Sequence, residues 1–144
     1  MFTHILVAVD GSDCSNKALD MAVRLAKDQG ARCTACIVVD VERSASSMTF
    51  ATEDLVNEWI ATLNDEARHI ENTAISKYSD SGVAIETKVL QGDPPTALLD
   101  AAKSGSADLV VLGSHGRTGL KRLWLGSVAE SVVQAATLPV LIVR

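Results

Sequence analysis

The chain has 144 residues, of which 47% are hydrophobic and only 3% aromatic, with a formal net charge of −5 and a pI near 5.1. This length predicts one compact domain over residues 1–144, with a core of Val, Leu, Ile and Ala. The acidic balance argues against nucleic acid or an anionic membrane as the main partner, so any affinity for phosphate must be local. No apolar run approaches the roughly 18 residues that a membrane span needs.

The amino terminus has no basic region, and its apolar run stops at Asp10 after a few residues. A signal peptide is therefore not expected, and the protein is predicted to be cytoplasmic. Three cysteines do not suit a disulfide framework. Cys33 and Cys36 are three residues apart on a predicted strand, where they would face opposite sides, so both are interpreted as core residues.

Strand and helix patterns alternate along the chain. Strands are predicted at 4–9, 32–40, 83–90, 108–112 and 139–143, and helices over 13–29, 55–75, 94–104 and from 127 onward. Segment 41–51 has no periodicity and is predicted to be a mobile loop, a candidate lid. Gly30 is expected to end the first long helix in a left-handed conformation, and Asp93 to cap a helix that begins at Pro94.

This alternation predicts an α/β fold, a single doubly wound five-stranded parallel sheet with helices on both faces, as in Rossmann-like domains. In such sheets a ligand binds beyond the carboxyl ends of the strands, where the strand order reverses. The reversal is expected between the first and fourth strands, which end at Asp10 and Gly113. Asp10 is therefore a candidate partner for a ribose or a metal ion, although a simple turn role is the alternative.

A glycine-rich loop joins the fourth strand to the last helix. Gly113, Gly116, Gly119 and Gly126 would let backbone N–H groups approach a phosphate, and each can adopt positive φ. The pattern Ser127-Val-Ala-Glu130 predicts a capping box, which places Gly126 and Ser127 at a helix N-terminus where anions bind. The basic residues of the loop are candidate partners for bound negative charge. They are Arg117, Lys121 and Arg122.

The spacing Gly113-x-x-Gly116, nine residues, then Gly126-Ser127 resembles the G-x2-G-x9-G-[S/T] signature of ATP-binding universal stress proteins. Residues 5–12 and 138–143 extend the resemblance, which spans the whole chain. It implies an adenine nucleotide alpha hydrolase-like fold that binds ATP, AMP or ADP, with Mg²⁺ or Mn²⁺ as a candidate ion. It further implies that the backbone at Val39 contacts the adenine edge, and that two copies form a homodimer through strand 139–143.

The predicted nucleotide-binding residues combine both arguments. They are Asp10, Val39, Gly113, Ser114, His115, Gly116, Arg117, Gly126, Ser127 and Val128. Within the loop, His115 is the residue able to exchange a proton near neutral pH, although a solvated loop role is the favoured interpretation.

Three function hypotheses remain open. Walker and G-x-G-x-x-G spacings are absent from the sequence, as is the Ser-Gly-Gly-x-Asp-Ser motif of adenylate-forming pyrophosphatases. A non-catalytic ATP-binding regulator of stress responses is therefore favoured. The alternatives are a slow metal-dependent nucleotide hydrolase that uses Asp10 or His115, and a dimeric interaction module in which the nucleotide is structural.

Overall fold

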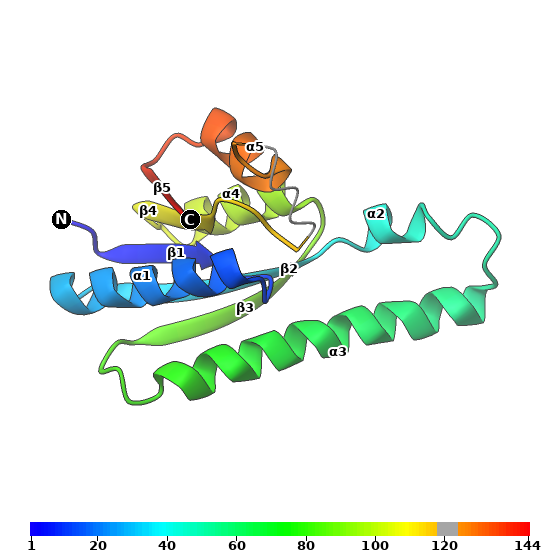
Figure 1. The fold of residues 1–144 in the computed structure, drawn as a ribbon, viewed down its shortest axis with the longest axis horizontal. Helices are drawn as coiled ribbons and strands as arrows, with labels where there is room; N and C mark the ends of the chain where they lie inside the picture. Colours follow the sequence, from blue (N-terminus) through cyan, green and yellow to red (C-terminus); the bar gives the residue numbers. More distant parts are fainter. Residues whose placement is uncertain (118–123) are drawn as a thin grey trace.

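The computed structural model describes residues 1–117 and 124–144, which form a five-stranded sheet flanked by helices (Figure 1). The strands are β1 (His4–Ala8), β2 (Arg32–Val39), β3 (Ile85–Gln91), β4 (Leu109–Gly113) and β5 (Val140–Val143). All paired strands run parallel, in the order β3-β2-β1-β4-β5. The predicted doubly wound sheet is confirmed, and its order reverses between β1 and β4 as expected.

The described helices are α1 (Asp13–Gln29), α2 (Val41–Ala45), α3 (Glu53–Tyr78), α4 (Pro94–Ser104) and α5 (Ser127–Ala135). Helices α1 and α3 pack on one face of the sheet, where Val7 and Cys33 are buried. Helices α4 and α5 pack on the other face, where Leu6 and Cys36 are buried. Adjacent strand residues therefore belong to different core layers, and the two cysteines face opposite sides as predicted.

Side-chain caps define where most helices begin. Ser12, Thr52 and Asp93 each accept a hydrogen bond from a backbone N–H in the first turn of α1, α3 and α4 respectively. Pro94 occupies the first turn of α4, as predicted. Gly30 ends α1 with φ of 65°, which confirms the expected left-handed cap.

The segment after β2 departs from the predicted loop. Asp40 accepts a hydrogen bond from the backbone N–H of Arg43 at 3.0 Å and starts the five-residue helix α2. The absence of periodicity misled the prediction for residues 41–45, because one helical turn is too short to show a period. Figure 1 shows the first part of α3 extending past the sheet edge. The buried residues of this helix, Ala67 and Ala74, lie further along it.

The third strand was predicted at 83–90, whereas β3 runs from Ile85 to Gln91 and so begins later. Among the described residues, no helix is long and apolar enough to cross a membrane.

Candidate functional site

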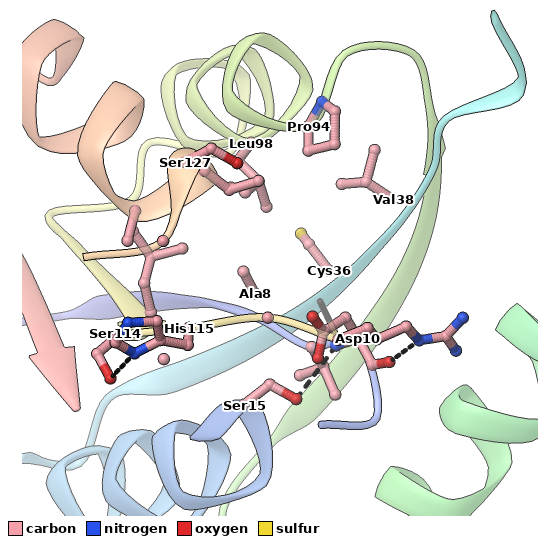
Figure 2. Close-up of a pocket in the computed structure, with 18 of the residues that line it drawn as sticks. Ala8, Asp10, Ser15, Cys36, Val38, Pro94, Leu98, Ser114, His115 and Ser127 are labelled. Atoms are coloured by element: carbon pink, nitrogen blue, oxygen red, sulfur yellow. Dashed lines mark hydrogen bonds between the residues drawn. The ribbon is translucent and has the colours of Figure 1, made fainter. Parts of the chain in front are cut away.

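A cavity of about 270 Å³ opens at the carboxyl ends of β1 and β4, at the predicted switch point (Figure 2). Its polar side is formed by the ends of these strands and the start of α5. Its apolar side comes from β2 and α4. Nine of the ten predicted site residues line this cavity: Asp10, Gly113, Ser114, His115, Gly116, Arg117, Gly126, Ser127 and Val128.

Asp10 is held at the cavity by the turn that follows β1. Its backbone N–H donates to Ser15 Oγ at 3.2 Å, and its Oδ1 accepts from the backbone N–H of Ser12 at 2.8 Å. Ser15 is buried in the first turn of α1, so the turn is anchored to the helix. The carboxylate consequently has a fixed position beside the glycine loop, where it can face a ribose hydroxyl or a metal ion.

The described glycines of the loop stand where segments of the chain pass closely. A Cβ on Gly113 would lie 2.8 Å from the carbonyl carbon of Cys14, and one on Gly116 would lie 2.8 Å from Asp10 Oδ2. At Gly126 it would lie 3.2 Å from the carbonyl oxygen of Ser114. None of these three glycines has positive φ. The predicted conformational reason is therefore wrong, and space is what requires glycine here.

Helix α5 begins differently from the other described helices. Its N-cap is Gly126, and no side chain caps it. The predicted capping box of Ser127 with Glu130 is wrong, because the helix starts one residue earlier. The backbone N–H of Gly126 instead donates to the carbonyl of Ser114 at 2.6 Å. Ser127, Val128 and Ala129, the first turn, line the cavity. Their end of the helix dipole therefore points at an open space suited to an anion.

Ser114 and His115 form the part of the polar wall that follows β4. The backbone N–H of Ser114 donates to the carbonyl of Val143 at 2.7 Å, which fixes this segment against β5. Ser114 Oγ lies 3.0 Å from His115 Nδ1 and 3.9 Å from Cys14 Sγ. The serine hydroxyl is thus engaged with the imidazole.

Arg117 turns toward β1 and α3. Its Nε donates to the backbone carbonyl of Asp10 at 2.7 Å, and its Nη1 lies 3.0 Å from Glu66 Oε2. The side chains of Arg117 and Glu66 are both about half exposed, at 53% and 50%. Of the other loop residues predicted to hold phosphate, Gly119, Lys121 and Arg122 lie outside the described residues.

Val39 is the predicted site residue that does not line the main cavity. It is buried in the core layer under α1 and α3, and its carbonyl accepts from the N–H of Gly92 at 3.1 Å. It lines an adjoining hollow of about 190 Å³, which shares Asp10, Val38 and Arg117 with the main cavity. Its neighbour Val38 faces the main cavity, so the end of β2 does contribute to the site.

The sequence did not predict which residues form the apolar wall of the cavity. Cys36 and Val38 alternate along β2, while Pro94 and Leu98 lie on α4 (Figure 2). The cation Arg43 of α2 also lines the cavity. The sequence did indicate that β2 and α4 contribute to the site. The carboxyl end of every predicted parallel strand meets the start of the following helix at this same edge of the sheet. Burial raises the pKa of Cys36 to about 12, so its thiol is neutral in this wall.

The glycine motif, the strand order and the cavity at the switch point agree with one family. A model of the universal stress protein family matches residues 1–144. The chain belongs to the universal stress protein family. Universal stress protein YxiE of Bacillus subtilis is 40% identical over 148 residues, covering 100% of both chains. Universal stress protein MJ0531 of Methanocaldococcus jannaschii is 35% identical and covers 100% of this chain and 83% of its own length.

Solved structures of other universal stress proteins are similar throughout. UspA from Lactobacillus plantarum superposes with a TM-score of 0.84 at 31% identity, covering 99% of this chain and 97% of the other. A universal stress protein solved in complex with cAMP gives a TM-score of 0.73 at 26% identity, with 99% and 97% covered. The family assignment and the parallel α/β fold therefore rest on both sequence and structure.

Proposed function

We propose that this universal stress protein binds an adenine nucleotide, ATP or its products ADP and AMP, in the cavity between β1 and β4. It would serve as a regulatory module of the cytoplasmic stress response. The observation that carries the proposal is the uncapped N-terminus of α5. Its first-turn residues line a cavity that also has an apolar wall, so one site offers both an anion-binding end and a surface for a base.

Each part of a nucleotide has a matching surface. The base would lie against Val38, Pro94 and Leu98, whose apolar atoms suit a flat aromatic ring. The ribose would face Asp10. The phosphates would lie among the backbone N–H groups of the glycine loop and the first turn of α5, where the helix dipole favours negative charge. A related universal stress protein was solved in complex with cAMP, which supports an adenine nucleotide as the ligand class.

A metal ion could bind at this site through one side chain, Asp10, together with the nucleotide. Asp10 offers one carboxylate at the cavity, and Mg²⁺ in nucleotide sites commonly uses one or two carboxylates together with phosphate oxygens. Among residues 1–117 and 124–144, no three His, Cys, Asp or Glu side chains are grouped to hold a metal ion. Mg²⁺ or Mn²⁺ would therefore bind with the nucleotide, held by Asp10 and the phosphates.

A homodimer is the second part of the proposal. Strand β5 pairs with β4 alone and forms an edge of the sheet. Its four residues are all apolar and only partly buried. An edge of this kind presents unpaired backbone groups, which a second copy of β5 could satisfy by antiparallel pairing.

Calorimetric titration with ATP, ADP and AMP tests the nucleotide proposal. Gly126→Val should abolish binding, because its Cβ would press on the carbonyl of Ser114 and force the loop away from α5. Thermal unfolding and circular dichroism should show that this variant keeps its fold. Ala61→Val, at an exposed position of α3, is the matched control and should bind as the original chain does.

Two results would count against the proposal. Unchanged affinity in a folded Gly126→Val protein would mean that the glycine loop does not hold the ligand. A steady-state ATPase rate of about 1 s⁻¹ or more, lost in Asp10→Ala, would favour the hydrolase hypothesis instead.

A further inference from the structure

We infer that Glu66 of α3 is a positioning residue of the nucleotide site, which holds the Arg117 guanidinium on the Asp10 side of the cavity and withholds this cation from bound phosphates. The inference rests on the proposed function. It assigns to a residue of the long helix, outside the glycine motif, a role in setting how strongly phosphate charge is recognised.

The three guanidinium nitrogens of Arg117 all face the turn after β1 or α3. Nε donates to the backbone carbonyl of Asp10 at 2.7 Å, and Nη1 lies 3.0 Å from Glu66 Oε2. Nη2 lies 3.9 Å from the place where a Cβ on Gly11 would stand. Figure 2 shows Asp10 apart from Ser114, His115 and Ser127, which line the end of the cavity proposed for phosphates. The cation is therefore turned away from that end.

Arg117 is nevertheless close enough to matter for a ligand. It lines both the main cavity and the adjoining hollow, so it stands at the boundary between them. Its backbone follows Gly116, where an added Cβ would lie 2.8 Å from Asp10 Oδ2, so the chain passes close to this carboxylate just before Arg117. Rotation of the side chain alone would change which space the guanidinium faces.

Charge determines whether Glu66 strengthens or weakens the binding of phosphate. A guanidinium binds a phosphate through paired, charge-assisted hydrogen bonds, and Glu66 competes for the same donors. The ion pair between Arg117 and Glu66 is half exposed, so solvent weakens it and its influence on affinity is modest. Removing the Glu66 carboxylate should favour ligands in proportion to their phosphate charge, most for ATP and not at all for adenosine.

The test compares dissociation constants of ATP and adenosine by calorimetry for the full chain and for Glu66→Gln, Arg117→Gln and the double variant. Glu66→Gln should raise the preference for ATP over adenosine about 3-fold, the scale of a half-exposed ion pair. In the Arg117→Gln background the same change should have no effect. A merely structural role for Glu66 would alter both ligands equally and would leave the preference unchanged.

Asp65→Asn is the matched control, because it removes the same charge from the neighbouring, exposed position of α3. It should leave the preference for ATP unchanged. The inference is overturned if Asp65→Asn matches Glu66→Gln, if the effect of Glu66→Gln survives in Arg117→Gln, or if Glu66→Gln does not raise the preference. Failure of the unaltered chain to bind ATP would sink the proposed function and this inference together, whereas binding with an unaltered preference would sink the inference alone.

Discussion

At the scale of single residues, Gly113, Gly116 and Gly126 each allow two segments of the chain to come into contact. Gly113 packs on the first turn of α1, Gly116 on the Asp10 carboxylate, and Gly126 on Ser114. The sequence predicted glycine at these positions for two reasons, close approach of the backbone to a phosphate and positive φ, and positive φ is wrong for all three. The close contacts within the protein could not be predicted from sequence, because they join residues up to about a hundred positions apart.

The cysteines give a prediction at this scale. Burial, together with the nearby Cys36, raises the pKa of Cys33 to about 12, and burial raises that of Cys36 to the same value. A raised pKa keeps a thiol protonated below it, so at pH 8 on the order of one in ten thousand of these thiols is ionised. Cys14 is only partly buried. We expect one thiol to react quickly with a disulfide reagent at pH 8 in the folded protein.

All three thiols should react in denaturant. Cys14→Ser should remove the fast phase and leave the slow labelling of the other two. Rapid labelling of two or more thiols in the folded protein would show that the core is open to the reagent, contrary to the burial of Cys33 and Cys36.

At the scale of elements, local signals predicted the starts of α1 and α4. Ser12 and Asp93 cap α1 and α4 through contacts three residues along the chain, which a sequence pattern can reveal. The start of α5 was misassigned by one residue. Ser127 and Glu130 have the spacing of a capping box. Gly126 nevertheless takes the cap position, because its N–H bonds to the carbonyl of Ser114. Such a bond between distant residues leaves no mark on the local pattern.

The edge strand β5 gives a prediction about assembly. The carbonyl of Pro139 accepts from Val110 of β4, and the carbonyl of Val143 accepts from Ser114, the residue after β4. By alternation along the strand, the N–H of Ile142 therefore faces the open edge. We expect Ile142→Pro to turn the proposed homodimer into a monomer, because proline removes this donor and leaves the bonds to β4 intact. Light scattering at micromolar concentration measures the change.

Ile142→Ala is the control, since it also loses the isoleucine side chain but keeps the N–H. It should remain a dimer. The side chain of Ile142 packs against the core layer under α4 and α5, so the alanine variant also controls for this lost packing. A monomeric original chain, or the same oligomeric state in both variants of Ile142, would contradict pairing through β5.

At the scale of the whole molecule, the parallel sheet brings distant residues to one edge. Asp10 and Gly113 could be placed together from sequence because strand alternation fixes which ends meet. The pairing of Arg117 with Glu66, 51 residues apart, could not. It depends on how far α3 extends and on the direction in which its side chains point. The apolar wall from β2 and α4 likewise needed the three-dimensional arrangement.

The central claim is that the phosphates of an adenine nucleotide are held by the glycine loop and the start of α5. A titration of the ¹⁵N-labelled protein with ATP, followed through backbone amide signals, tests it most directly. The largest shifts should come from residues 113–117 and 126–128, with smaller shifts at Val38 and Leu98 beside the base. Saturation of the protein without shifts in those two segments, or no response to ATP at millimolar concentration, would contradict the claim.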